Sequence, residues 1–483
     1  MRGGTDATVK RGHRGPDPPE WVLDLFREAS DRVPAYRDFL AGVGVEPAEI
    51  DSPAALARVP PVSKRNYLRA YPWRELLLDG NCHAARVVST SSGSSGVPFY
   101  WPRDTVSQAE AASTYQRLVD HFGGRTRESL VVISFAMGNW IAGTYTLDAM
   151  QCLSDADYPL TTITPGIDVA ASVRALADLA PSFEQTILCG YPPLVKDVLD
   201  AATAAGVDLQ RLGIRVILAG EVISESWRGH LAGLFGGDPS SDILLIYGTA
   251  DMGAVGTESP ATVWLRRQAV HHEAVRSALF GEVSTLPTLV EIDPAQRYVE
   301  SVDGSLLLTA RGALPLIRYA IGDVGLVHPS DEVRAELMDA LDGGLPAAVD
   351  RALSRPLVTV GGRPDVAASF YALNLYPENI KHGLEAADVR AMVSGKFVVR
   401  VTEDGEAARP TLRVLVELAD GQRRDSVDGQ VRAAVIAGLV ETNAEYRQLH
   451  AQLGDLAEPV VELAEFGRPD FAIDAKHRWT EPS

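Results

Sequence analysis

The sequence predicts a large α/β protein with mixed or parallel sheets that carries a small α+β unit at its C-terminal end. Between about residues 85 and 330, short apolar runs such as LVVISF, TILCG and DILLIYG alternate with helical stretches such as VAASVRALADLA. The runs are continuously apolar, which is typical of parallel strands buried on both faces. With 483 residues, of which 46% are apolar, the chain is long enough for two or three domains.

The first 20 residues predict a loose tail, because they are polar, rich in Gly and Pro, and lack the apolar segment of a signal peptide. Apolar residues from Trp21 to Leu40 then follow a helical spacing that Pro34 interrupts, so we expect a pair of surface helices. Three scattered cysteines form neither a disulfide framework nor a zinc motif, and a reducing cytoplasm is the expected location.

The strand run ARVVST opens the α/β core, and LVVISF, TILCG, IRVILAG and DILLIYG follow it in order. Residues 130–147 include LVVISF and carry no formal charge, which reaches the lower length limit for a membrane span. Ser, Gly, Asn and Thr residues interrupt this segment, so a buried strand that enters a loop fits it better. We therefore expect neither a transmembrane helix nor a membrane partner.

The C-terminal third predicts an antiparallel section and then a small α+β unit. In residues 298–308, YVESVDGSLLL, an Asp-Gly turn between two strand-like runs predicts a hairpin. FVVRVTEDGEAARPTLRVLVEL predicts a second hairpin, VDGQVRAAVIAGLVETNAEYRQLHAQLG one helix, and PVVELAEFG a last strand. Glycines and a proline in GGRPDVA mark the junction, which predicts an N-terminal domain over residues 21–363 and a mobile C-terminal domain over residues 364–483.

The charge balance of the chain excludes one broad class of function. Asp and Glu outnumber Lys and Arg by 64 to 45, which gives a net charge of −19. Nucleic-acid binding depends on cations that neutralise phosphates, so we expect no nucleic-acid partner. Any anion that the protein binds must be held by a local site.

The stretch STSSGSSGVP, residues 89–98, is the strongest candidate for such a site. It follows the strand-like ARVV and precedes the helix-like SQAEAASTYQRLVDHF. Small and hydroxyl residues let backbone N–H groups converge on an anion while the hydroxyls add donors, which favours phosphate binding. A flexible linker is the alternative for such a composition, and the position between two regular elements favours a functional loop.

Four later segments carry polar residues where strands end. They are IRVILAGEVIS, LLIYGTADMG, LIRYAIGDVG and VGGRPDVAASFYALNLYPENI. Each segment alone is explained by an ordinary turn or by packing, because Gly followed by an acid is common in turns. Taken together, in this order after the Ser/Gly loop, they resemble the adenylate-forming ligase superfamily, which activates carboxylic acids with ATP.

The resemblance covers about residues 20–480 and is greatest to the phenylacetate-CoA ligase-like branch, which includes the coronafacate ligase-type amide synthetases. It implies that ATP and Mg²⁺ are the cofactors. It also implies that six residues of the Ser/Gly loop cradle the ATP phosphates: Ser91, Ser92, Gly93, Ser94, Ser95 and Gly96.

The resemblance implies the remaining nucleotide contacts as well. Gly220 and Glu221 match the segment that borders the adenine. Tyr247 matches the aromatic residue that stacks on the adenine, and the binding segment continues through Gly248 and Thr249. A carboxylate that binds both ribose hydroxyls is matched by Asp323.

Further roles concern catalysis and domain motion. The family usually has Thr-Glu at Ala250-Asp251, so Asp251 keeps a carboxylate for Mg²⁺ whereas Ala250 lacks the hydroxyl that touches a phosphate. Arg363 matches the catalytic arginine at the domain junction, and Asp365 resembles the hinge. Lys476 is the candidate for the lysine that the mobile domain brings to the site. Such cations are needed because a carboxylate must approach a phosphate, and both are anions.

The segment SFAMGNWIAGTY and the turn CGYPP supply candidate walls for the acid. Trp140, Gly143, Tyr145 and Tyr191 are expected to line a mostly apolar pocket for a hydrophobic carboxylic acid, and aromatic residues of this kind also occur as plain core. Glycines on both sides of Trp140 favour a site, because they let a ligand approach the backbone.

The sequence is compatible with several acceptors for the acyl group. An acyl-adenylate can pass to an amine or amino acid, to the thiol of CoA, or to a carrier-protein thiol. The C-terminal tail resembles that of acyl-amide synthetases, and Ala475 stands where CoA-forming members have Gly, so we expect an amine acceptor. An acyl- or aryl-CoA ligase is the alternative. A third hypothesis is an inactive relative that only binds a nucleotide or acyl group, and a homodimer is one option for the assembly.

Overall fold

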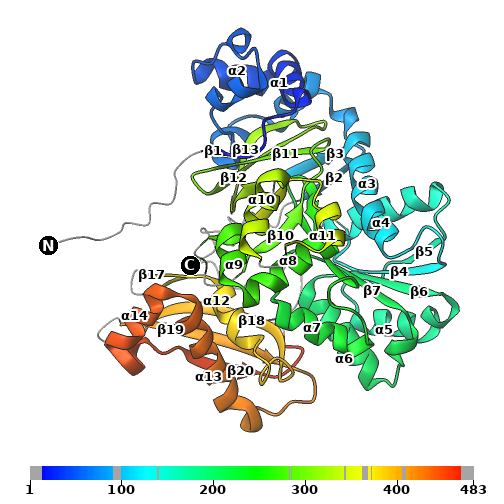
Figure 1. Ribbon diagram of the computed structural model, residues 1–483, viewed down its shortest axis with the longest axis vertical. Coiled ribbons are helices and arrows are strands. Elements are labelled where there is room, and N and C mark those ends of the chain that lie inside the picture. Colours follow the sequence, from blue (N-terminus) through cyan, green and yellow to red (C-terminus); the bar gives the residue numbers. More distant parts are fainter. Residues whose placement is uncertain are drawn as a thin grey trace.

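The computed structural model describes residues 13–90, 99–138, 141–281, 283, 286–341, 344–361, 368–370, 373–404, 409–468 and 471. In this part of the chain, nine strands form a central mixed sheet in the order β14-β15-β10-β9-β8-β7-β6-β4-β5 (Figure 1). The strands are β4 (Ser129–Ser134), β5 (Leu160–Ile163), β6 (Gln185–Gly190), β7 (Ile214–Ala219), β8 (Ile243–Thr249), β9 (Gly253–Thr257), β10 (Thr288–Glu291), β14 (Val327–His328) and β15 (Leu357–Val360). The predicted α/β fold class is confirmed.

The half of this sheet from β5 to β8 is parallel, as the continuous apolar runs predict. Successive side chains of a strand point to opposite faces, and β4 shows the result. Val131 and Ile133 pack into one core, whereas Leu130 and Val132 pack into the core on the other face. From β8 to β14 the neighbouring strands are antiparallel.

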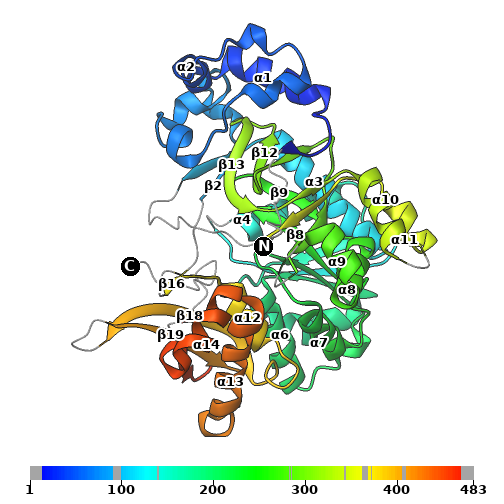
Figure 2. The ribbon, with the colours of Figure 1, turned by 60° about the vertical axis from the view of Figure 1, so that its left-hand side comes forward.

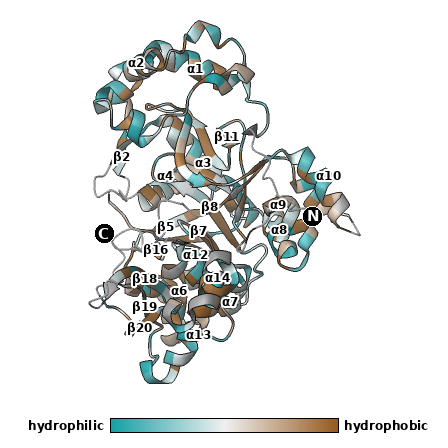
Figure 3. Cartoon of the chain, turned by 90° about the vertical axis from the view of Figure 1, so that its left-hand side faces the viewer, coloured by the Kyte–Doolittle hydropathy of each residue, from teal (hydrophilic) through white to brown (hydrophobic). Residues whose placement is uncertain are grey.

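Helices cover both faces of the parallel half (Figures 1 and 2). One face is covered by α3 (Thr105–His121) and α4 (Ile141–Asp155). The other is covered by α5 (Val169–Asp178), α6 (Pro192–Ala204) and α7 (Glu225–Phe235). Beside the antiparallel half lie α8 (Pro260–His271), α9 (Glu273–Phe280), α10 (Ser330–Ala340) and α11 (Ala347–Ala352). Figure 3 shows that the central strands are mostly hydrophobic, whereas α10 carries more hydrophilic residues.

A second, antiparallel sheet has the order β1-β11-β12-β13 and lies under the N-terminal helices (Figure 1). Its strands are β1 (His13–Arg14), β11 (Arg297–Val302), β12 (Ser305–Ala310) and β13 (Leu316–Val324). The predicted Asp-Gly hairpin is β11–β12, whose turn residues Asp303 and Gly304 both have positive φ. The predicted helix pair is α1 (Glu20–Arg32) and α2 (Pro34–Gly42). The inner face of this pair is buried.

The prediction that ARVVST belongs to the central sheet is wrong. β2 (Val87–Thr90) instead pairs with β3 (Tyr100–Arg103) in a separate antiparallel hairpin. A strand, and not the helix α3, therefore follows the Ser/Gly loop. The sequence pattern concealed β3 because YWPR is short and contains a proline, which is tolerated on an edge strand.

The residues from 368 onward that the structure describes pack around their own hydrophobic core, and we call this unit the C-terminal core. Its elements are a three-stranded sheet of β18 (Val393–Asp404), β19 (Arg409–Leu418) and β20 (Val460–Ala464), the short pair β16 (Ala368–Phe370) and β17 (Leu373–Leu375), and α12 (Pro377–Leu384). The prediction of a single helix after the hairpin is wrong. This segment forms two helices, α13 (Arg424–Thr442) and α14 (Ala444–Leu453). They are separate because Asn443 is extended and its side chain caps α14 by accepting the Tyr446 N–H at 2.9 Å.

The C-terminal core lies beside α6 and α7 (Figure 2), and hydrogen bonds of Lys396 with Asp197 and of Arg390 with Ser226 join it to these two helices. The predicted domain boundary at residue 363 falls outside the described residues and stays a prediction. Within the part of the chain that the structure describes, no helix is both long and apolar enough to span a lipid bilayer.

Candidate active site

Two reciprocal Tyr–Asp hydrogen bonds join the central sheet to the second sheet. The Tyr247 hydroxyl, on β8, donates to Asp323 on β13 at 2.6 Å. In the opposite direction, the Tyr319 hydroxyl on β13 donates to Asp251 at 2.6 Å. The structure thus brings together Tyr247 and Asp323, which the sequence predicts to contact the adenine and the ribose of one nucleotide. Both carboxylates are almost completely buried.

Asp251 has a second partner, which comes from the N-terminal region. The Lys64 ammonium lies 3.0 Å from an Asp251 carboxylate oxygen. The side chain of Asp251 is 4% exposed, and that of Lys64 is 30% exposed. The carboxylate is therefore buried, whereas the lysine side chain beside it is partly exposed to solvent.

A partly buried arginine fixes the backbone around Asp251. The Arg103 guanidinium, on β3, donates to the carbonyl oxygens of Ala250 and Asp251 and to the Ser89 hydroxyl. Burial lowers the pKa of Arg103 to about 10, which leaves it cationic at neutral pH. Because Arg103 and Ser89 belong to the hairpin that flanks the Ser/Gly loop, this arginine ties that hairpin to the Asp251 loop.

A cavity of about 70 Å³ opens beside these groups. Its apolar wall contains Tyr115, Phe135, Ile141, Tyr145, Tyr191 and Ile246. The lining also includes small residues, namely Gly220, Gly248, Thr249, Ala250 and Gly253. Among the described residues that line the cavity, none has a formal charge. This composition suits an uncharged organic group next to exposed backbone N–H and C=O groups.

The tyrosines of the wall keep their protons. Burial raises the pKa of Tyr115, Tyr145 and Tyr191 above the ordinary value of a phenol. Tyr115 shares a 2.5 Å hydrogen bond with Thr146, and the Tyr145 hydroxyl accepts the Ala254 N–H at 3.4 Å. These contacts fix the rings that shape the cavity.

Two glycines allow this packing. A Cβ on Gly143 would meet the Ala136 carbonyl oxygen and the Met137 sulfur at 2.5 Å, so Gly143 lets α4 approach the end of β4 instead of lining the cavity. At Gly253, φ is +74° and a Cβ would lie 2.7 Å from the Tyr145 ring. Gly253 therefore allows the Tyr145 ring to pack closely against the start of β9.

The C-terminal core contacts the predicted adenine wall directly. The Lys381 ammonium, on α12, lies 3.3 Å from a Glu221 carboxylate oxygen and also donates to the Val222 carbonyl. Its neighbour Glu385 accepts the Ser224 N–H at 3.2 Å. Glu221 thus pairs with Lys381 of the C-terminal core, and its neighbour in the sequence, Gly220, lines the cavity.

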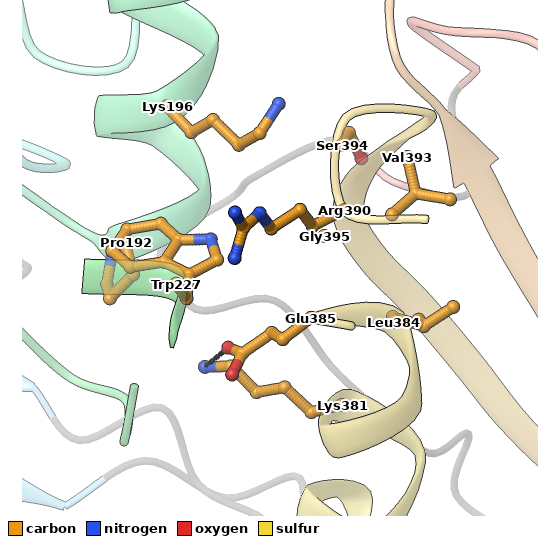
Figure 4. A pocket seen from close by; sticks show the side chains of 10 residues that line it. All are labelled: Pro192, Lys196, Trp227, Lys381, Leu384, Glu385, Arg390, Val393, Ser394 and Gly395. Atoms are coloured by element: carbon orange, nitrogen blue, oxygen red, sulfur yellow. Dashed lines mark ion pairs between the residues drawn. The ribbon is translucent and has the colours of Figure 1, made fainter. Parts of the chain in front are cut away.

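Buried charges continue this interface. The Lys396 ammonium, at the start of β18, lies 2.6 Å from Asp197 on α6 and 3.3 Å from Glu417 on β19. Figure 4 shows the neighbouring small cavity, with Lys381 and Glu385 paired at 3.9 Å and Arg390 extended toward α7. Its volume of about 20 Å³ leaves room for about one water molecule, so the two surfaces fit closely.

Several predicted site residues lie outside the described residues, and their roles stay predictions. They are Ser91, Ser92, Gly93, Ser94, Ser95, Gly96, Trp140, Arg363, Asp365 and Lys476. The flanking Thr90 does line the cavity. The loop that starts after Thr90 is therefore connected to the cavity wall.

Sequence reasoning missed Lys64, Arg103 and Lys381. Each acts over a long separation, as in the Lys381 contact with a residue 160 positions away. One local signal existed for Lys64, because Ser63 and Asn66 form a capping box at the start of its short helix. That signal locates a helix end and says nothing about a site.

Comparisons with known proteins agree with this architecture. No family model matches the chain. The chain is 23% identical over 399 residues to a phenylacetate-coenzyme A ligase of Aromatoleum evansii, a match that spans 81% of this chain and 79% of that protein.

Two solved structures of 2-hydroxyisobutyryl-CoA ligase in the postadenylation state share the fold. The complex with 2-HIB-AMP gives a TM-score of 0.59 and the complex with R3-HIB-AMP 0.58. Each is 15% identical in sequence, with 96% of this chain and 89% of that chain covered. The chain is thus similar in sequence to a phenylacetate-coenzyme A ligase along most of both chains, and it shares the fold of 2-hydroxyisobutyryl-CoA ligase.

Proposed function

We propose that the protein activates a hydrophobic carboxylic acid with ATP, forms an acyl-adenylate, and then transfers the acyl group to an acceptor. One observation carries this proposal. One cavity is lined both by Tyr145 and Tyr191 of the predicted acid pocket and by Gly220 and Gly248–Ala250 of the predicted nucleotide segment. An acid and the α-phosphate of ATP can meet only where two such half-sites adjoin.

In the first step, a carboxylate oxygen of the acid attacks the α-phosphorus of ATP. A new P–O bond forms, the bond to the β-phosphate oxygen breaks, and pyrophosphate leaves with the electron pair. The uncharged wall of the cavity favours the apolar body of the acid, which leaves its carboxylate at the rim near Gly248–Ala250. Tyr247 and Asp323 are linked at 2.6 Å and would hold the adenosine end.

Asp251 is the residue that would hold Mg²⁺. A single carboxylate fits this ion, because Mg²⁺ in nucleotide sites takes most of its ligands from phosphates and water. The carboxylate already pairs with one positive charge, since the Lys64 ammonium lies 3.0 Å from it, and this supports its role as a ligand for a cation. When bound, Mg²⁺ would neutralise phosphate charge, while Tyr319 keeps the carboxylate oriented through its 2.6 Å hydrogen bond.

The C-terminal core is proposed to supply Lys476 in the first step and to rotate about Asp365 before the second. Its docked position depends on the two lysines Lys381 and Lys396, which reach Glu221 and Asp197 in the larger part of the chain. Rotation must break both contacts. The docked interface is therefore an element that an acyl-adenylate or an acceptor could shift.

The acceptor has two candidates. The name of the curated relative, a phenylacetate-coenzyme A ligase, supports the thiol of CoA. The sequence of the C-terminal tail supports an amine or amino acid. Both acceptors would attack the same acyl-adenylate carbonyl and release AMP, so the first step is common to the two.

Pyrophosphate release from Mg·ATP tests the proposal. A panel of aromatic, cyclic and branched carboxylic acids is assayed with no acceptor, with CoA, and with mixed amino acids. Acid-dependent release is expected, and the acceptor that raises turnover identifies the second step. Asp323→Ala is expected to abolish release, whereas the matched control Asp331→Ala, at a 93% exposed side chain, keeps it. An enzyme that binds ATP but releases no pyrophosphate with any acid or acceptor would contradict adenylation.

A further inference from the structure

Lys64 is held in a fixed place although it lies far from the other site residues in the sequence. Val62 pairs with β13, where its N–H donates to the Arg318 carbonyl at 3.2 Å and its carbonyl accepts the Ala320 N–H at 2.8 Å. The buried Arg318 guanidinium also binds the carbonyl oxygens of Ala57 and Val59. The backbone that leads to Lys64 is thus attached to the strand that carries the two site residues of the second sheet.

The Lys64 side chain lies in a corner of three groups. Its ammonium is 3.0 Å from Asp251 and 5.6 Å from the centre of the Trp101 ring, and Tyr319 donates to the same carboxylate. Trp101 is 1% exposed. The ammonium thus lies near an aromatic ring and a carboxylate, and the Lys64 side chain as a whole remains 30% exposed.

This corner lies between the two segments that are expected to face the ATP phosphates. Trp101 pairs with Ser89 across the β2–β3 hairpin, whose connection is the Ser/Gly loop. Asp251 follows Gly248–Ala250, which line the cavity. A cation that contacts both the hairpin and the Asp251 loop is placed beside any polyphosphate that binds between them.

We propose that Lys64 is a phosphate-binding cation of the large domain. Without nucleotide, it neutralises Asp251. With Mg·ATP bound, Asp251 would hold the metal, and the Lys64 ammonium would turn on its flexible stem to the triphosphate or to the pyrophosphate that leaves. This inference rests on the proposed function and adds to it a second cation that is independent of Lys476.

The geometry makes two predictions of opposite sign. Removing the charge of Lys64 removes a charge-assisted hydrogen bond to phosphate, so ATP binds more weakly when Mg²⁺ is absent. The same change removes the competitor of Mg²⁺ for Asp251, so half-maximal binding of ATP requires less Mg²⁺. A lysine that only stabilises the fold would not produce the second effect.

The experiment measures ATP binding to the full-length protein by calorimetry, in EDTA and across a Mg²⁺ titration. Lys64→Met keeps the length of the side chain without its charge, and Arg65→Met is the matched control because Arg65 is its exposed, charged neighbour. In EDTA, Lys64→Met is expected to weaken ATP binding by about tenfold to a hundredfold, the range for a hydrogen bond to a charged group. Arg65→Met and Lys64→Arg are expected to stay close to the parent protein.

A double-variant cycle separates a phosphate contact from an effect exerted through Asp251. In an Asp251→Asn background the charge that Lys64 neutralises is gone, yet Lys64→Met is still expected to weaken ATP binding severalfold. No effect in that background would overturn the inference and leave Lys64 as a partner of Asp251 alone. If the parent protein failed to bind ATP, the proposed function would fail with it, which is a distinguishable result.

Discussion

Lys396 is predicted to hold the C-terminal core in its docked position. Its side chain is 7% exposed, and the two carboxylates that it contacts, Asp197 and Glu417, are 5% and 1% exposed. Lys396→Met would leave both acids buried without the lysine that pairs with them. Removing one partner of a buried ion pair costs about 3–5 kcal/mol. Undocking exposes Asp197 to water and relieves this penalty, so the variant should favour the undocked state.

The expected shift in the docking equilibrium is large. At about 1.4 kcal/mol per factor of ten, the penalty corresponds to a change between about a hundredfold and a few thousandfold. The amide of Ser224 reports this change, because it donates to Glu385 across the interface and cannot exchange while the bond is intact. Hydrogen–deuterium exchange resolved at Ser224 should therefore accelerate in Lys396→Met.

Two further variants complete this test. Arg432→Met removes an ion pair with Glu458 inside the C-terminal core, where the arginine is 54% exposed, and should leave exchange at Ser224 unchanged. A triple variant that also neutralises the acids, with Asp197→Asn and Glu417→Gln added to Lys396→Met, should recover most of the protection. Equal exchange at Ser224 in Lys396→Met and the parent protein would refute the reasoning.

Four other outcomes are expected. Asp323→Ala should abolish measurable ATP binding in calorimetry, because the ribose loses its charge-assisted hydrogen bonds. An unchanged affinity for ATP would show that Asp323 does not bind the nucleotide. Gly253→Ala should lower pyrophosphate release with large acids more than with small ones, because its Cβ would lie 2.7 Å from the ring of Tyr145 and displace this side chain, which lines the cavity; a uniform loss would contradict this. Burial raises the pKa of Asp197 to about 6 in the docked state. Between about pH 4 and pH 6, Asp197 is therefore protonated when docked and ionised when undocked. Docking should weaken as the pH rises through this range. Asp197→Asn should flatten that dependence in the exchange assay, and a retained slope would assign it to another group. Lys476→Ala should slow pyrophosphate release while ATP affinity stays within about twofold, as for a contact made in the transition state. Equal rates of release in the variant and the parent protein would show that Lys476 takes no part in adenylation.

The central sheet could be predicted because its signal is local. A strand buried on both faces must be apolar at every position, so LVVISF and IRVILAG stand out in the sequence without any knowledge of their neighbours. The Asp303-Gly304 turn is equally local, since positive φ at both residues favours that dipeptide. These signals decided the fold class.

The failed predictions concern elements that depend on distant partners. β3 contains a proline and gains its place from pairing with β2 and from Arg103, which binds Ala250 at a separation of 147 residues. The break at Asn443 lies inside a continuous helical pattern and is stabilised by a side-chain cap that the pattern does not reveal.

The candidate site shows the same division. Tyr247 and Asp323 were found through a family resemblance, and the structure gives their 2.6 Å contact, which no spacing in the sequence encodes. Lys64 is not among the residues that the family resemblance identifies, and the capping box beside it indicates only where a helix begins. A lone lysine near a helix start is common on protein surfaces, and only the fold places this one beside Asp251.

The reciprocal Tyr–Asp bonds also constrain how the site can evolve. Tyr247 and Asp323 lie 76 positions apart, and Tyr319 and Asp251 lie 68 apart, yet each hydroxyl is matched to one buried carboxylate. A change at one position leaves its partner buried and without that hydrogen bond, so compensating changes should arise in pairs. An alignment of relatives should therefore show these four positions covarying as two separate couples.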